Sequence, residues 1–274
     1  MPKDLSGRVL PLGDAHDPAL FGGKAAQLAV AVSHGLPVPD GVALPWPLVE
    51  AVTAGDEGAI RAVVEGCAPL QGPLVARSSA VGEDSAEASF AGQHLSLLGL
   101  PGPEAVADAV VAVGRSAGSE PALAYRDRLG LPPDPRVGIV VQRLVDPDVA
   151  GVLFDVNPVT GADEVVIEAT WGLGETVVSG SVVPDLFRLG TAGTLLEYRP
   201  GTKDVEVRPA PDGGTVRFEV DDERARARSL SGGQLVELHA LAVRCRAVFG
   251  GTQDLEWAFA DGTLWLLQRR PLTA

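Results

Sequence analysis

Residues 252–273 read TQDLEWAFADGTLWLLQRRPLT, and this stretch indicates two β-strands that meet at a turn. Asp254 and Glu256 are two residues apart, so their side chains share one face of the first strand. Gln268 and Arg270 stand in the same relation on the second strand. Whether the two pairs meet on a common surface depends on the register of the hairpin.

The turn decides this register. A two-residue turn, Asp261-Gly262, would set Glu256 opposite Leu267 and separate the two pairs. A three-residue loop that also includes Thr263 would set Glu256 opposite Gln268, and the aspartate opposite the arginine. The second register gathers two carboxylates, an amide oxygen and a guanidinium on one surface, a set that suits Mg²⁺ and a phosphate. A solvated polar face is the alternative interpretation.

The composition is that of a folded, acidic protein. The chain has 274 residues, of which 46% are hydrophobic and 21% charged, and its formal net charge is −14. This charge argues against a general nucleic-acid binder, which needs a basic surface against phosphate. No apolar run reaches the roughly 18 residues of a membrane span, so we expect no membrane association. Cys67 and Cys245 are too few for a cysteine zinc site, and we expect a cytoplasmic protein with reduced thiols.

Helix-like and strand-like segments are mixed along the chain, which favours the α+β class. The first half contains a glycine turn that opens an alanine-rich helix at residues 22–31, and a short strand at 73–77. In the second half, several strand-like runs precede an amphipathic helix at 231–249 and the closing hairpin. We therefore expect two α+β parts, residues 1–135 and 136–274, with room for a ligand between them.

Two basic residues of the first half stand where an anion could bind. Lys24 follows Gly22-Gly23 at the start of the helix, where backbone N–H groups and the helix dipole favour negative charge. Arg77 ends the short strand and precedes a loop rich in hydroxyl groups and glycines, which could hold a polyphosphate. A solvated lysine and a structural salt bridge of the arginine are the competing interpretations.

Taken in order, six segments resemble the N-terminal nucleotide-binding domain of the phosphoenolpyruvate synthase, pyruvate phosphate dikinase and rifampin phosphotransferase family. They are GGKAAQL at 22–28, VARSSAVGED at 75–84, SFAGQHLSLLGL at 89–100, VVQRLVDPDVAGVLFDVNPVTG at 140–161, GLGETVVSGSVVPDLF at 172–187 and the hairpin at 252–273. The match runs nearly from end to end of the chain. It implies an ATP-grasp fold, in which two α+β lobes, an N-terminal one at 1–135 and a C-terminal one at 136–274, hold the nucleotide in a cleft between them.

The resemblance also implies ATP and Mg²⁺ as cofactors and a role for each motif residue. The implied roles are phosphate contact for Lys24 and Arg77, stabilisation of the transferring phosphoryl group for Arg270, and Mg²⁺ binding for Glu256 and Gln268, with Asp254 in support. These roles agree with the chemistry, because phosphoryl transfer needs positioning and charge neutralisation more than a covalent protein nucleophile.

The remaining nucleotide contacts implied by the resemblance lie in two short segments. Gly92 and Ser96 would lie in the phosphate loop, where the family often has threonine in place of this serine. The segment that receives adenine, largely through its main chain, would consist of Gln142, Arg143, Leu144 and Val145.

The full-length enzymes of this family carry a separate domain with a phosphorylatable histidine, and no histidine of this sequence stands in the corresponding Thr-His motif. We therefore expect a kinase- or dikinase-like enzyme that transfers a phosphoryl group from Mg-ATP to a histidine of a separate carrier protein. Two alternatives stay open: a stand-alone kinase that phosphorylates a small metabolite directly, and a non-catalytic nucleotide-binding regulatory module. The joint presence of the metal ligands and the phosphate-binding cations argues against the last alternative.

Overall fold

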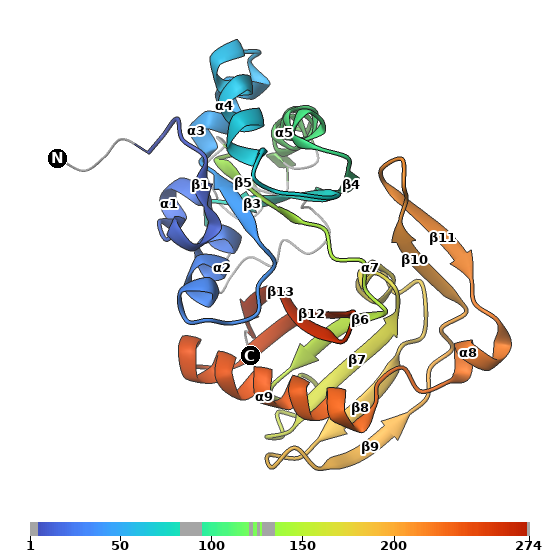
Figure 1. Ribbon diagram of the computed structural model, residues 1–274. Helices are drawn as coiled ribbons and strands as arrows, with labels where there is room; N and C mark the ends of the chain where they lie inside the picture. Colours follow the sequence, from blue (N-terminus) through green and yellow to red (C-terminus); the bar gives the residue numbers. More distant parts are fainter. Residues whose placement is uncertain (1–4, 83–94, 121–122, 125–126, 128–134, 273–274) are drawn as a thin grey trace. The chain divides into compact units, whose positions relative to one another are not determined.

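The computed structural model describes residues 5–82, 95–120, 123, 124, 127 and 135–272 (Figure 1). The chain divides into two compact units: unit 1 falls within 1–33, 40–144 and 211–214, and unit 2 within 34–39, 145–210 and 215–274. This division differs from the boundary after residue 135 that the sequence indicated. The reason is that strand β5 (Val137–Arg143) pairs inside the sheet of unit 1.

The sheet of unit 1 is antiparallel. Its strands are β1 (Leu10–Pro11), β2 (Gly41–Leu44), β5, β3 (Leu74–Ala80) and β4 (Ser96–Leu100), in that spatial order. β5 lies between β2 and β3, and its apolar side chains are buried on both faces. This explains why its sequence is a continuous apolar run rather than an alternating one.

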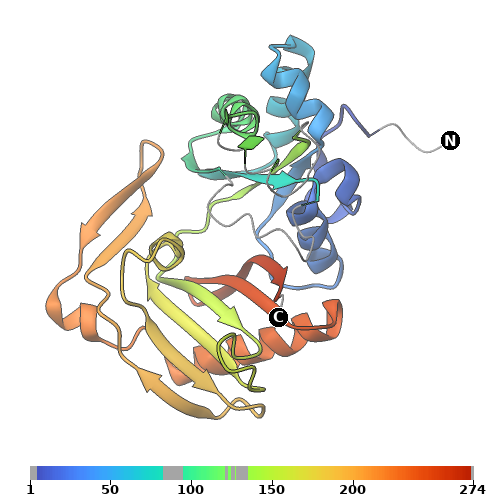
Figure 2. The same cartoon turned by 180° about the vertical axis from the view of Figure 1, so that it is seen from behind.

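Helices cover both faces of this sheet (Figures 1 and 2). On one face, α3 (Trp46–Thr53), α4 (Glu57–Cys67) and α5 (Pro103–Ala117) form the core together with alternate residues of β5 and β3. On the other face lie α1 (Pro18–Phe21) and α2 (Gly23–Ser33); the Phe21 carbonyl approaches Gly138 of β5 so closely that a Cβ there would lie 2.5 Å from its oxygen. The α2 face of the sheet is the one that carries the candidate residues of unit 1.

Unit 2 is built on a second antiparallel sheet. Its strands are β13 (Thr263–Pro271), β12 (Gln253–Ala260), β6 (Val149–Phe154), β7 (Val165–Trp171), β8 (Asp185–Leu189) and β9 (Leu195–Arg199), in that spatial order. The sheets and helices of the two units confirm the α+β class that the sequence predicted.

Helix α9 (Gly232–Phe249) covers one face of the sheet of unit 2 (Figures 1 and 2). It starts at a capping box, in which Ser231 and Gln234 satisfy each other's backbone N–H groups. Its buried residues, Leu235, Leu238, Leu241, Ala242 and Cys245, all belong to the stripe that the helical periodicity predicted, whereas Val248, the sixth predicted residue, is half-buried. None of the described helices is long and apolar enough to cross a lipid bilayer.

A smaller hairpin, β10 (Val205–Pro209) paired with β11 (Thr215–Glu219), and the short helices α7 (Glu175–Val178) and α8 (Asp222–Arg226) complete unit 2. A fully buried ion pair anchors the segment that leads into this hairpin: Lys203 Nζ lies 2.7 Å from Asp185 Oδ1. Asp185 also accepts hydrogen bonds from Gly201 N and from Ser229 N and Oγ. Every oxygen of this buried carboxylate is therefore satisfied.

Candidate functional site

The β12–β13 hairpin has the register that brings the predicted metal-binding residues together. Glu256 lies opposite Gln268, and Asp254 opposite Arg270, so all four side chains project from one face of the sheet. α9 lies on the other face, where Arg269 stacks on Phe249 with its guanidinium carbon 4.5 Å from the ring centroid. Of the two registers that the sequence left open, the structure has the one that gathers the four side chains on one face.

The turn is not the one that the sequence analysis associated with this register. Ala260 pairs with Thr263, so the turn consists of only two residues, Asp261 and Gly262, both with positive φ (49° and 71°). This is the turn that was expected to separate the two pairs. A β-bulge corrects the register, because Trp257 pairs with Leu266 while the preceding glutamate pairs with Gln268. The bulge adds one residue to β13, which has the same effect as a loop lengthened by one residue.

Arg270 ties the two carboxylates of the hairpin together. Its Nη2 lies 3.3 Å from Asp254 Oδ2 and 3.6 Å from Glu256 Oε1. Burial raises the pKa of Asp254; the guanidinium of Arg270 opposes this shift, and the negative charge of Glu256 adds to it. Arg270 thus holds the two acids close together.

The donor set of the hairpin fits Mg²⁺. Within the described ranges, no three or more His, Cys, Asp or Glu residues are grouped as a metal site. The set offered here is instead Glu256, the neighbouring amide oxygen of Gln268 and the carboxylate of Asp254. Mg²⁺ takes oxygen ligands, and it is commonly held by one or two carboxylates while water and phosphate oxygens complete the octahedron. Glu256 and Gln268 would hold the ion, with Asp254 beside them.

The same face carries a further carboxylate that the sequence analysis missed. Val152 of β6 pairs with Glu256 on one side and with Glu168 of β7 on the other, so the Cα atoms of the two glutamates lie about 10 Å apart, two strand spacings. In the described part of the chain, the carboxylate of Glu168 makes no hydrogen bond or ion pair, and burial raises its pKa. β7 is otherwise a buried strand, so its single acid was the signal that could have revealed this position.

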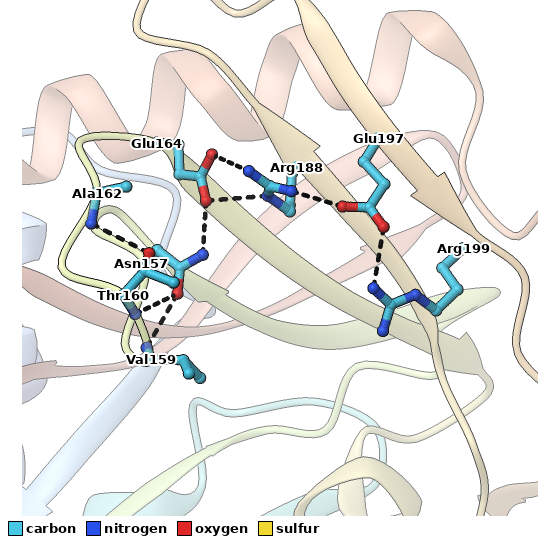
Figure 3. A network of polar contacts seen from close by, with 8 residues as sticks. All are labelled: Asn157, Val159, Thr160, Ala162, Glu164, Arg188, Glu197 and Arg199. Atoms are coloured by element: carbon cyan, nitrogen blue, oxygen red, sulfur yellow. Dashed lines mark hydrogen bonds and ion pairs between the residues drawn. The ribbon is translucent and has the colours of Figure 1, made fainter.

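Farther along the sheet, charged side chains neutralise one another (Figure 3). Arg188 of β8 donates from Nε and Nη2 to the Glu164 carboxylate at 2.9 and 2.7 Å, and from Nη1 to Glu197 at 2.6 Å. Arg199 donates to the other oxygen of Glu197, and Asn157 donates to Glu164. Hydrogen bonds from Arg188 lower the pKa of both glutamates. These acids are matched by arginines, which makes the network a structural support rather than a metal site.

In unit 1, Lys24 is buried instead of solvated, with 6% of its surface exposed. Its Nζ donates to the Ser78 carbonyl at 2.8 Å, and the backbone N of Ala25 donates to Ser79 Oγ at 3.0 Å. The start of α2 is thereby fixed to the end of β3. Among the described residues no hydrogen-bond partner is found for the buried Ser78 Oγ, but this side chain lies on the α3–α5 face of the sheet with Ile139, opposite to Ser79 and α2, and so adds nothing to this site.

Arg77 and Ser96 are brought together by the sheet. They are register partners on β3 and β4, and Arg77 lies on the same face as Ser79. Arg77 is half-buried and Ser96 is exposed. The predicted phosphate loop between these strands includes Gly92, which lies outside the described residues.

The predicted adenine segment leads the chain from unit 1 into unit 2. Gln142 is buried on the α2 face, opposite Gly41 and Val75. The backbone N of Arg143 donates to Asp40 O at 3.0 Å and that of Leu144 to Pro73 O at 2.8 Å, so these two amides serve the fold of unit 1. Val145 begins the second segment of unit 2, where it packs with Ala150 and Ala258.

Comparison with known protein families shows to which family the chain belongs. Residues 47–274 match the model of the pyruvate phosphate dikinase AMP/ATP-binding domain. The chain belongs to this family. The family is defined by its AMP/ATP-binding domain. The resemblance that the sequence motifs showed is therefore confirmed. ATP is accordingly a ligand of the domain, and α+β lobes of the ATP-grasp type are what the family motifs imply.

Named relatives of this family are much longer than the chain. A probable phosphoenolpyruvate synthase of Methanothermobacter thermautotrophicus is 43% identical over 200 residues, which cover 72% of this chain and 29% of the relative. The prodigiosin synthesizing transferase PigC of Serratia marcescens is 34% identical, covering 94% and 32%. The rifampicin phosphotransferase of Bacillus subtilis is 34% identical, covering 72% and 23%. The chain thus spans about a third or less of these proteins.

Solved structures show only distant similarity. PH1788 of Pyrococcus horikoshii matches with a TM-score of 0.47 and 12% identity, covering 94% of both chains. The VanG D-Ala:D-Ser ligase of Enterococcus faecalis matches with a TM-score of 0.44 and 12% identity, covering 93% of this chain and 53% of the ligase.

Proposed function

We propose that the chain is a Mg-ATP-dependent phosphotransferase that transfers a phosphoryl group to a histidine of a separate carrier protein. The observation that carries this proposal is the β12–β13 register, which sets Glu256 opposite Gln268 and Asp254 opposite Arg270 on one face. A nucleotide-binding module without turnover has no need of metal ligands and a transfer cation on one surface. Membership of a family whose named relatives include a synthase and phosphotransferases supports the same interpretation.

Residues of each unit would have a role in binding or transfer. Lys24 and Arg77, with Ser96, would contact the phosphates of ATP, because a buried lysine at a helix start and an arginine beside a hydroxyl favour an anion. Gln142 to Val145 would receive adenine. Bound Mg²⁺ would neutralise charge on the phosphates. Arg270 would stabilise the negative charge of the transferring group, a contribution that is large in preorganised sites.

The acceptor is proposed to reside on another polypeptide segment. The named relatives are about three times the length of the chain, and the family resemblance assigns the phosphorylatable histidine to a domain other than the nucleotide-binding one. In that family the histidine takes the β-phosphate: cleavage of the α–β bond of ATP releases AMP, and water cleaves the β–γ bond to release phosphate. We therefore expect AMP and phosphate as products.

Product analysis tests this proposal. The purified chain is incubated with Mg-ATP, alone and with a histidine-bearing carrier domain of a phosphoenolpyruvate synthase, and the nucleotides are separated. AMP plus phosphate that appear only with the carrier are expected. Formation of ADP together with a phosphorylated small molecule would show that the acceptor is a metabolite and not a carrier protein. Binding of ATP without any product would show that the chain is a nucleotide-binding module. Glu219→Ala, an exposed position on β11, serves as the charge-matched control for Glu256→Ala.

A further inference from the structure

The β10–β11 hairpin and α8 carry a chain of charged contacts to which the proposed function gives no role (Figure 1). Arg208 of β10 donates from Nη1 to Asp146 Oδ1 at 3.3 Å and to the Pro147 carbonyl at 3.4 Å. From Nη2 it donates to Glu206 Oε2 at 3.4 Å. Arg224 of α8 donates to both oxygens of the same Glu206 carboxylate, at 3.1 and 2.8 Å. These contacts connect α8 with the segment Asp146-Pro147.

The central carboxylate of this chain is buried and ionised. Glu206 is 8% exposed, and burial by itself would raise its pKa. Hydrogen bonds from Arg224 and Arg208 outweigh burial and lower the pKa below its ordinary value. Arg224 is in turn fixed by Trp171, whose ring centroid lies 5.0 Å from the guanidinium carbon and whose Nε1 donates to the Arg224 carbonyl at 3.0 Å. Arg208 is therefore held in place by a rigid partner.

The hairpin does not need Arg208 for its own attachment. Val207 forms a parallel bridge with Gly172, and its carbonyl accepts a hydrogen bond from Leu173 N at 2.8 Å. The two strands are paired along their whole length, from Val205 opposite Glu219 to Pro209 opposite Thr215. The backbone of the hairpin thus stays bound to unit 2 when the Arg208 side chain is removed, so this side chain is available for a separate role.

Arg208 acts on the backbone that directly follows the predicted adenine segment. Val145, the last residue of that segment, packs with Ala150 and Ala258, and Asp148 N donates to the Phe259 carbonyl at 2.9 Å. Pro147 lies between these two fixed points, and its carbonyl accepts a hydrogen bond from Arg208. Asp146 itself is largely exposed, so its ion pair with Arg208 contributes little. The contact with the Pro147 carbonyl is the one that sets the path of the backbone.

We infer that Arg208, held by Glu206 and Arg224, is a positioning residue that fixes the backbone just after Val145, the last residue of the predicted adenine segment, and so contributes to the affinity for the nucleotide base. This inference rests on the proposed function. It concerns the base rather than the phosphates, because the contacts of Arg208 end at Asp146-Pro147 and include none of the β12–β13 face. Loss of Arg208 is expected to weaken binding of ATP without changing the chemical step.

Binding measurements on the full chain test the inference. The dissociation constants of Mg-ATP and of Mg-tripolyphosphate, which has no base, are measured by calorimetry for wild type, Arg208→Ala and Arg208→Lys. Arg208→Ala is expected to raise the dissociation constant of Mg-ATP about tenfold, near the lower end of the effect of losing one charged hydrogen bond, and to leave that of tripolyphosphate unchanged. Arg208→Lys keeps the positive charge but loses the planar guanidinium that donates to several acceptors at once, so a smaller rise in the dissociation constant of Mg-ATP is expected. Arg217→Ala, exposed on β11, is the matched control and should bind as wild type does.

The other outcomes overturn either the inference alone or the proposed function together with it. Wild-type affinity of Arg208→Ala for Mg-ATP overturns the inference alone. Equal weakening of Mg-ATP and tripolyphosphate would mean a general loosening of unit 2, and it also overturns the inference. Should Arg208→Ala unfold at the assay temperature, the comparison is made with Arg208→Lys, and wild-type affinity of that variant for Mg-ATP counts against the inference. A wild-type chain that does not bind Mg-ATP overturns the proposed function, and the inference with it.

Discussion

Replacing Gly22 by alanine is expected to separate the start of α2 from β3. Gly22 has φ 81° and ψ 170°, a region that is essentially limited to glycine. A Cβ built on it would lie 2.0 Å from the Ser79 carbonyl oxygen. Because this neighbour is backbone, no side-chain rotation relieves the overlap. The two segments must move apart, and both contacts that fix Lys24 in place, Lys24 Nζ to Ser78 O and Ala25 N to Ser79 Oγ, are then lost.

The magnitude follows from these two contacts. A charged hydrogen bond contributes about 1.5–3 kcal/mol and a neutral one about 0.5–1.5 kcal/mol, so their loss costs roughly 2–4 kcal/mol. Backbone strain at Gly22 adds about 1–3 kcal/mol. Gly55→Ala is the matched control, because Gly55 also has positive φ (85°) in unit 1 but has no atom within 4 Å of the Cβ position. The control bears strain without the overlap.

Urea unfolding followed by circular dichroism measures the difference. With a slope of about 2 kcal/mol per molar, the midpoint of Gly22→Ala should fall roughly 1–2 M further than that of Gly55→Ala. The dissociation constant of Mg-ATP should rise only for Gly22→Ala, since that variant displaces Lys24. Equal losses of stability in the two variants would refute the reasoning, because they would show that the close approach to Ser79 contributes nothing beyond strain.

Three further predictions follow. Glu256→Ala should abolish turnover while leaving the thermal unfolding midpoint within a few degrees of wild type, and an unchanged rate would remove this residue from the metal site. Lys203→Met should destabilise unit 2 by about 3–5 kcal/mol, because it leaves the buried Asp185 charge uncompensated, and the double variant with Asp185→Asn should recover part of the loss in calorimetric unfolding. Glu168→Gln should raise the unfolding midpoint at pH 7. Burial raises the pKa of Glu168, so the folded state is favoured while the group is protonated and loses stability as pH rises through the folded pKa; the gain should vanish below the unfolded pKa of about 4.3, and a gain that persists at pH 3 would contradict this explanation.

Periodic and local signals in the sequence were sufficient for most of the elements. The stripe of α9 follows from its helical period, and its buried residues are those that the sequence indicated. The assignment of β5 to a unit could not be read in this way. A continuous apolar run predicts a buried strand but not its neighbours, and only pairing with β2 and β3 places β5 in unit 1.

The candidate site was predictable where spacing alone decides it and obscure where tertiary contacts do. The side-chain pairs of β12 and β13 follow from a two-residue period, whereas the bulge at Leu267 has no local signature, so the correct register was reached through the wrong turn. Lys24 was expected at a solvated or anion-binding helix start, but its burial against Ser78 depends on a strand 54 residues away. The sequence analysis missed Glu168 because its place on the same face as Glu256 depends on the pairing of β6 between β7 and β12.

The bulge in β13 gives the metal-binding face a dependence on parity. Eleven residues separate Glu256 from Gln268, an odd number, and a hairpin closed by a two-residue turn matches residues separated by even numbers unless a bulge intervenes. Deleting Leu267, the bulged residue, would leave ten residues between them, and a regular ladder would then set Glu256 opposite Gln268 without a bulge. The shared face therefore needs either an odd number of intervening residues together with the bulge or an even number in a regular ladder, and a turn longer by one residue could replace the bulge without altering which side chains meet.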